Sequence, residues 1–292
     1  MSKKVAFLSM DDMTGFVSDD DLTIEAFGKR GILVETMSWR SDRDWNDFDA
    51  VILRSTWDYQ AAFDEFMNAL RRIEQSRALL MNSIDVVEWN IDKRYLAELE
   101  QNDVSTVPTI WMDPFDVNVI YESARAFETD ELIVKPTVSA NADNTFRFTT
   151  SELNDNSQRV DDLKLVFARR SAMIQPFVDS VLDEGEYSLF VIGNELTHAV
   201  VKKPKKGDYR VQEEHGGAIE SFEPDQSLRD FVVLAMSKLP FDLLYARIDV
   251  VRHSGQPHVM ELELIEPSLY FRFSDYAIQK FVASVANRLD RE

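Results

Sequence analysis

The stretch VMELELIEPSLY, residues 259–270, sets three glutamates among apolar residues. In an extended strand alternate side chains share a face, so Glu261 and Glu263 point to one side while Met260 and the two leucines point to the other. Glu266 comes just before a proline, where the strand should end. The pattern predicts a strand with one acidic face, which either lies in solvent or binds a cation.

The preceding segment RIDVV, residues 247–251, adds a further carboxylate to this face. A short connection containing Gly255 predicts an antiparallel hairpin, which brings Asp249 close to Glu261 or Glu263. Three carboxylates on one sheet face repel one another unless a cation lies among them. Hard oxygen ligands suit Mg²⁺ or Mn²⁺, so the hairpin predicts a metal site, with a solvated acidic strand as the alternative.

Composition narrows the class of protein. The 292 residues suit two domains or one large α/β unit with subdomains, and 45% hydrophobic residues are ample for a core. The absence of cysteine excludes a disulfide framework and a thiolate zinc site. A formal net charge of −20 disfavours a nucleic-acid partner. The apolar runs are too short for a signal peptide or a membrane span, so we expect a cytoplasmic protein without a membrane partner.

The first third of the chain alternates strand and helix patterns. Strands are expected at 3–10, 32–39, 49–59 and 78–83, and helices at 19–31 and 63–76. Such alternation predicts a parallel sheet with functional groups at the carboxyl ends of its strands. Two polar segments occupy those ends, and they contain Arg54, Ser55, Thr56, Asp58, Asn82 and Ser83. Capping and turn hydrogen bonds are the alternative role for each.

The remaining two thirds mix helices with strands that pair locally. A helix is expected at 85–102, strand–loop–strand at 130–148, and antiparallel hairpins from residue 185 onward. Helices at 225–239 and 274–290 complete the pattern.

Cations stand out in so acidic a chain. Lys135 ends an apolar strand and is followed by the small polar segment 137–145, which could close over phosphates. The stretch 200–217 contains five cations, including Lys202 and Arg210, and a Gly-Gly pair that permits close backbone approach. A solvated basic loop is the alternative for that stretch. Taken alone, the pattern around Lys93 predicts a surface lysine on a helix.

These segments, in this order, resemble the ATP-grasp superfamily, including glutathione synthetases and ribosomal-protein glutamate ligases. RSTWDY (54–59), GDYRVQ (207–212) and ELELIEPSLY (261–270) are similar to the cyclo-ligases of D-cycloserine biosynthesis, which act on O-ureido-serine. The resemblance implies an α/β protein with the ATP-grasp fold. Its N-terminal parallel α/β subdomain, 1–85, would bind the substrate, and two α+β subdomains, the lid at 86–178 and the metal-bearing 179–292, would sandwich ATP.

The resemblance also implies roles for the nucleotide-binding residues. Lys93 and Lys135 match the two lysines that hold the nucleotide phosphates. The adenine would be read by the extended segment Gln175, Pro176, Phe177 and Val178. Glu186 stands where the family has its ribose carboxylate.

Further roles follow for catalysis, metal and substrate. Lys202 and Arg210 match the cations that hold the γ-phosphate and the acyl phosphate. The metal ligands would be Asp249, Glu261 and Glu263. The amino acid part of the substrate would be bound by Arg54, Ser55, Thr56, Asp58, Asn82, Ser83 and Glu266.

The chain departs from the family at two places. Glu263 stands where many relatives have asparagine, which adds negative charge to the metal cluster. The segment SANADNT, 139–145, has no glycine, whereas many relatives have a glycine-rich loop there.

The expected activity is that of an ATP-dependent carboxylate–amine ligase. A carboxylate attacks the γ-phosphate of ATP, and a nitrogen then displaces phosphate from the acyl phosphate. The cofactors would be ATP with Mg²⁺, two ions, or Mn²⁺ in its place. The nitrogen would belong to the same amino acid-like substrate, which closes a cycloserine-type ring, or to a second amino acid. A non-catalytic ATP-binding regulatory protein is the alternative of a different class.

Overall fold

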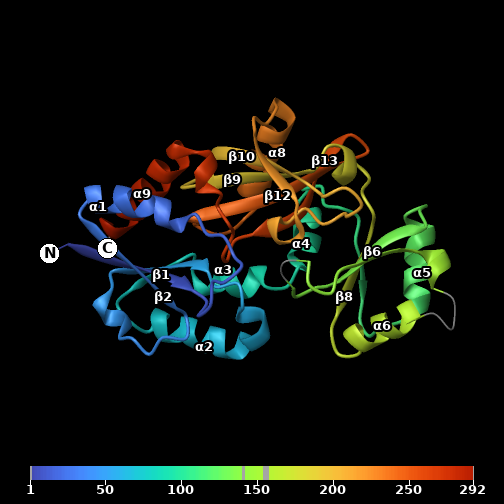
Figure 1. Ribbon diagram of the computed structural model, residues 1–292, viewed down its shortest axis with the longest axis horizontal. Coiled ribbons are helices and arrows are strands. Elements are labelled where there is room, and N and C mark those ends of the chain that lie inside the picture. The colour runs from blue at the N-terminus through green and yellow to red at the C-terminus, as the bar shows by residue number, and fades with distance from the viewer. Residues whose placement is uncertain (1, 140–141, 154–157, 292) are drawn as a thin grey trace.

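The computed structural model describes residues 2–139, 142–153 and 158–291, and its chain forms three sheets (Figure 1). The N-terminal sheet has the order β2-β1-β3-β4 and is parallel throughout, as the alternating pattern predicts. Its strands are β1 (Lys3–Ser9), β2 (Ile32–Ser38), β3 (Ala50–Ser55) and β4 (Leu79–Met81). Its helices are η1 (Asp20–Thr23), α1 (Ile24–Lys29), η2 (Trp45–Asp47), η3 (Tyr59–Ala62) and α2 (Phe63–Glu74).

The middle sheet is antiparallel with the order β5-β8-β6-β7. It forms a separate lobe with α5 and α6, seen on the right of Figure 1. Apolar side chains from both helices and from the sheet form one core cluster there. The elements are β5 (Ile110–Met112), α5 (Val117–Ala126), β6 (Glu131–Pro136), β7 (Phe146–Thr149), η4 (Thr150–Glu152), α6 (Gln158–Phe167) and β8 (Ala172–Pro176).

The C-terminal sheet is antiparallel with the order β11-β10-β9-β12-β13, which confirms the predicted hairpins. Its strands are β9 (Glu186–Ile192), β10 (Glu195–Lys203), β11 (Ala218–Phe222), β12 (Tyr245–His253) and β13 (Gln256–Glu263). Its helices are α7 (Ser180–Asp183), η5 (Glu213–His215), α8 (Gln226–Ser237), η6 (Phe271–Phe273) and α9 (Asp275–Leu289). No helix in the described ranges is long and apolar enough to cross a membrane.

The last helix joins the C-terminal sheet to the N-terminal one. α9 lies beside α1 (Figure 1), and Phe281 of α9 packs against Phe7 and Phe27. Phe190 of β9 belongs to the same apolar cluster. The first and last segments of the chain therefore share one core.

The predicted helix at 85–102 is wrong as a single helix. The structure has α3 (Ile84–Asn90) and α4 (Tyr95–Gln101), and Lys93 lies in the break between them. The Lys93 amide donates to the Thr137 carbonyl (2.8 Å), and the Arg94 amide donates to the Asp92 carboxylate (3.0 Å). These bonds replace intrahelical ones, so the break costs little hydrogen bonding.

The hairpin that carries the acidic residues contains a β-bulge. Asp249 pairs with Glu261, as predicted, but the next pair is Val250 with Val259. Met260 is therefore an extra residue on β13. The prediction that it points away from Glu261 is wrong, because the bulge ends the strict alternation at this position.

Two buried asparagines tie the N-terminal half to the hairpin. Asn82 donates to the carbonyls of Tyr245 (3.0 Å) and Leu264 (2.8 Å) and accepts from the Leu244 amide (2.7 Å). Asn90 donates to the Leu262 carbonyl and accepts from the Leu264 amide, both at 2.9 Å. Each asparagine side chain supplies the hydrogen bonds that a neighbouring strand would otherwise make to these backbone groups at the end of the sheet.

We predict that Asn82→Ala lowers the free energy of unfolding by about 2–4 kcal/mol, because it leaves several buried backbone groups without a partner. Urea unfolding followed by circular dichroism measures this change. Asn68→Ala, at an exposed position of α2, is the matched control and should stay within about 0.5 kcal/mol of the parent. Equal stability of the two variants would contradict the role assigned to Asn82.

Candidate active site

A cavity of about 200 Å³ is lined by residues of the middle and C-terminal sheets and of the loops around them. All the residues expected from the sequence to bind ATP, phosphate or metal contribute to its wall. They are Lys93, Lys135, Gln175, Pro176, Phe177, Val178, Glu186, Lys202, Arg210, Asp249, Glu261 and Glu263, and Glu266 joins them.

Two of the three hairpin carboxylates are paired with Arg247. Its guanidinium bonds Asp249 (2.9 Å) and also Glu263, while the Ser188 hydroxyl donates to Asp249. Burial alone would raise the pKa of Asp249, but the charges of Arg247 and Lys202 lower it to about 2. Burial, together with the nearby charges of Asp249 and Glu261, raises the pKa of Glu263 to about 7 despite Arg247. Asp249 is thus the firmly ionised member of this pair.

Lys202 connects a second acidic residue to the same cluster. Its ammonium lies 2.7 Å from the Glu186 carboxylate and 3.3 Å from that of Asp249, and the lysine is 3% exposed. Burial favours the neutral amine, yet the two carboxylates outweigh it and raise the pKa of Lys202 above its usual value. Lys202 stays charged in the cavity wall.

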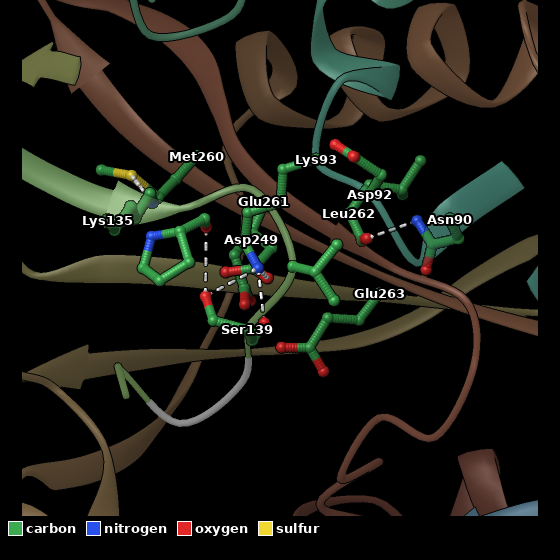
Figure 2. A network of polar contacts seen from close by, with 12 residues as sticks. Asn90, Asp92, Lys93, Lys135, Ser139, Asp249, Met260, Glu261, Leu262 and Glu263 are labelled. Atoms are coloured by element: carbon green, nitrogen blue, oxygen red, sulfur yellow. Dashed lines mark hydrogen bonds and ion pairs between the residues drawn. The ribbon is translucent and has the colours of Figure 1, made fainter. Parts of the chain in front are cut away.

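Lys93 and Lys135 approach the cluster from the other side. The Lys93 ammonium lies 3.1 Å from Glu261 and donates to the Ser139 carbonyl (2.6 Å), as Figure 2 shows. Lys135 has Met260 sulfur at 4.0 Å and no carboxylate within ion-pair distance among the described residues. Burial lowers the pKa of Lys135 from its usual value. Of the two lysines, Lys135 is the one ready to receive an anion.

The chemistry and the spacing of the three hairpin carboxylates bear differently on metal binding. Their hard oxygens, on one face of two adjacent strands, are the chemistry that Mg²⁺ prefers. Nowhere in the described ranges, however, do three such groups stand close enough together to hold an ion. Each carboxylate is instead paired with Lys93, Lys202 or Arg247. The carboxylate oxygens have the chemistry that a divalent cation requires, but in this structure they bond cations of the protein and do not converge on one point.

The basic stretch divides into exposed and site residues. Lys203, Lys205 and Lys206 are exposed, whereas Lys202 and Arg210 line the cavity. Arg210 bonds Asp208 through two nitrogens, at 2.8 and 3.1 Å. The Gly-Gly pair serves the loop itself: a Cβ on its second glycine would lie 2.1 Å from the Val211 carbonyl oxygen. The close backbone approach predicted from the sequence is therefore within the loop.

The segment expected to close over phosphates is described in part. Its residues 140 and 141 lie outside the described ranges. Ser139, Ala142 and Thr145 line the cavity. The Tyr209 hydroxyl donates to the Thr145 carbonyl (2.9 Å), which joins this segment to the basic loop.

The residues expected at the edge of the N-terminal sheet do not line this cavity. Asp58 bonds Trp39 and Arg40, and Asn82 is fully used by backbone groups of the C-terminal segment. Ser55 and Thr56 are buried, and Ser83 is exposed at the start of α3.

Arg54 has a distinct environment. It is 2% exposed, pairs with Asp20 (2.7 Å) and lines a small adjoining cavity together with Trp57 and Tyr270. Its Nη1 has no hydrogen-bond partner in the described part of the chain. This leaves one buried donor beside the main cavity.

Several residues of the cavity wall, and Ser188 behind it, were missed by the sequence reasoning. Arg247 stands two positions before Asp249, so strand alternation could have placed it on the acidic face. Ser188 pairs with Asp249 across β9 and β12, which required the strand register. Trp57 and Tyr59 line the cavity from the loop after β3.

Comparison with known proteins shows the family to which this chain belongs. Models of the N-terminal domain of D-cycloserine synthetase DcsG and of the RimK-like ATP-grasp domain match residues 5–82 and 127–269. The chain is 30% identical over 279 residues to the cycloserine biosynthesis protein DcsG of Streptomyces lavendulae, covering 91% of this chain and 92% of that protein. The chain belongs to the ATP-grasp family. It is therefore an ATP-dependent ligase that forms carbon–nitrogen bonds, and such ligases use ATP with Mg²⁺.

Solved ATP-grasp structures show the same arrangement of elements. The crystal structure of D-cycloserine synthetase DcsG has a TM-score of 0.84 at 27% identity, across 98% of this chain and 99% of that chain. D-alanine–D-alanine ligase from Bacillus anthracis has a TM-score of 0.67 at 14% identity, across 99% and 98% of the two chains. The second comparison is a likeness of fold alone.

We predict different structural costs for the two cavity cations Lys202 and Arg210. Lys202→Met should lower the free energy of unfolding by about 3–5 kcal/mol, because it leaves Glu186 and Asp249 buried near each other without that charge. Arg210→Ala should stay within about 0.5 kcal/mol, since the Arg210 side chain is 38% exposed and pairs within its own loop. Urea unfolding tests both. A large loss in Arg210→Ala would contradict this assignment.

Proposed function

We propose that this ATP-grasp ligase activates an amino acid of the O-ureido-serine type and closes a cycloserine-type ring. The observation that carries the proposal is that one cavity collects the lysines, the hinge segment and the hairpin carboxylates expected for such a ligase. The likeness to DcsG over nearly the whole chain supports the choice of substrate. A soluble nucleotide substrate also suits the cytoplasm, where we place the reaction.

In the first step the substrate carboxylate attacks the γ-phosphate of ATP, and ADP leaves. This step depends on positioning and charge neutralisation rather than covalent participation of the protein. Lys93 and Lys135 would hold the nucleotide phosphates, while Lys202 and Arg210 would stabilise the charge on the transferred group. The backbone from Gln175 to Val178 would read the adenine, with Gln175 held in place by its bond to Thr109 (3.0 Å).

The metal would be held by Asp249, Glu261 and Glu263, as two Mg²⁺ ions or Mn²⁺ in their place. When bound, a divalent cation neutralises the β- and γ-phosphates. The existing ion pairs suggest an exchange of partners: phosphates attract Lys93 and Lys202, and the carboxylates that these lysines release become available to the metal. The exchange would leave neither of these two lysines, nor the carboxylates they release, without a partner of opposite charge.

In the second step a nitrogen of the same substrate attacks the acyl carbon and phosphate leaves. For an O-ureido-serine this nitrogen is the one bonded to the side-chain oxygen. It loses its proton as it bonds the acyl carbon, and the five-membered product ring keeps the carbamoyl group on that nitrogen. Ring closure gains from the intramolecular approach of the two groups. The amino acid part would contact Glu266 and the free Nη1 of Arg54. The other residues expected from the sequence to bind the substrate would lie outside the cavity wall and support this region. They are Ser55, Thr56, Asp58, Asn82 and Ser83.

A substrate screen tests the proposal. The full chain is mixed with ATP, Mg²⁺ and either O-ureido-D-serine, O-ureido-L-serine or pairs of ordinary amino acids, and ADP and product mass are measured. We expect ADP and a ring-closed product with one O-ureido-serine alone. ADP only with amino acid pairs would assign a peptide-type ligase. ATP binding without ADP under any condition would assign a regulatory protein.

We further predict that Glu263→Ala lowers Mg²⁺-dependent turnover about 100-fold or more and leaves the fold intact, because it removes one proposed metal ligand from a partly exposed position. ADP release at increasing Mg²⁺ is the measurement, with circular dichroism as the check of folding. Glu220→Ala, an exposed residue of β11, is the control. Full activity of Glu263→Ala would remove Glu263 from the metal site.

A further inference from the structure

Glu266 occupies a fixed position at one end of the cavity. It follows β13 and lines the wall together with Trp57 and Tyr59. The Trp57 indole donates to the Glu266 carbonyl (2.9 Å), and Arg54 donates to the Pro267 carbonyl (3.3 Å). The backbone of Glu266 and Pro267 is therefore held against the end of β3 and the loop that follows it.

This partly buried carboxyl group lacks the cation that the other acidic residues of the wall have. Glu186, Asp249, Glu261 and Glu263 each form an ion pair with a lysine or arginine. No lysine, arginine or histidine in the described ranges forms one with Glu266, and its side chain bonds the Tyr59 hydroxyl.

A buried carboxylate without a cation is unfavourable, and a ligand that brings a cation relieves it. Burial first, and then the charge of Glu263, raises the pKa of Glu266 to about 8. The lysines and Arg210 on the remaining wall suit the phosphates, so an anion is not expected at this end. The unmet requirement at Glu266 is for positive charge.

We propose that Glu266 binds the protonated primary amine of the amino acid substrate. This inference rests on the proposed function and adds the group by which the substrate is recognised. The aromatic side chains of Trp57 and Tyr59 line the same end and exclude water from the ion pair. Recognition by Glu266 selects substrates with a free amine over analogues without one.

The ion pair also has a chemical consequence for the second step. An amine that keeps its proton has no lone pair with which to attack the acyl phosphate. The nucleophile is then the nitrogen bonded to the side-chain oxygen, which bonds the acyl carbon and gives up its proton as phosphate leaves. Glu266 would thus direct the reaction toward ring closure, in addition to binding the substrate.

The test compares Glu266→Gln with the parent chain, using O-ureido-D-serine and its analogue that lacks the α-amine. ADP release is measured at saturating ATP and Mg²⁺. In Glu266→Gln we expect KM for O-ureido-D-serine to rise about 10- to 100-fold, with KM for ATP and the Mg²⁺ requirement changed by less than about twofold. The parent should prefer the amine by a similar factor, and Glu266→Gln should lose that preference.

Controls separate this role from others. Glu220→Gln, which changes an exposed carboxylate on β11, should behave as the parent. Glu266→Asp keeps the charge and should retain a preference for the amine, which covers the case in which Glu266→Gln folds poorly by circular dichroism. Calorimetric binding of O-ureido-D-serine in the presence of ADP and Mg²⁺ gives a second readout and should weaken by the same factor in Glu266→Gln.

Two results would overturn the inference while the proposed function stands. One is an active Glu266→Gln that keeps the parent's preference for the amine. The other is a changed Mg²⁺ requirement with an unchanged KM for O-ureido-D-serine, which would make Glu266 a metal ligand. Absence of ADP from the parent chain with every amino acid would instead overturn the proposed function, and the inference with it.

Discussion

Mutual repulsion among buried carboxylates is the constraint on which the site depends. Asp249 and Glu261 face each other across the hairpin, and Glu263 and Glu186 lie near them. Such a group is stable only with positive charge at close range. The cations come from separate parts of the chain, namely β10, β12 and the break between α3 and α4, so satisfying the charges also brings these segments together.

This pairing explains how the site can be stable without ATP and still bind it. A cavity lined by free lysines, or by free carboxylates, would destabilise the fold, because every unpaired charge loses its hydration. Here the anionic phosphates can replace the carboxylates as partners of the lysines. A divalent cation can replace the lysines as partner of the carboxylates. Binding then needs no net creation of buried charge, although the chain as a whole carries a formal net charge of −20.

The scaffold around the charges is made of directional backbone bonds. Asn82 and Asn90 hold the end of β13 against the N-terminal half, and the Thr137 carbonyl holds the backbone of Lys93. These bonds fix where the lysine and the hairpin meet. The bulge at Met260 adds to this, since it sets the register that places Asp249 opposite Glu261.

The sequence by itself determined the parallel N-terminal sheet, the antiparallel hairpins and the charged residues that line the cavity. Alternation, helical periodicity and isolated cations are local signals. Those in strands predict the fold because a paired strand keeps alternate side chains on the same face of the sheet. Only the tertiary structure decided the break at Lys93, the position of Met260 and the partners of Asn82, Asp58 and Arg54. Each of these depends on a bond to a residue far away in the chain or on strand register, which local patterns do not encode. The pairing of the carboxylates belongs to the same class, because it requires Arg247, Lys202 and Lys93 to converge from different elements.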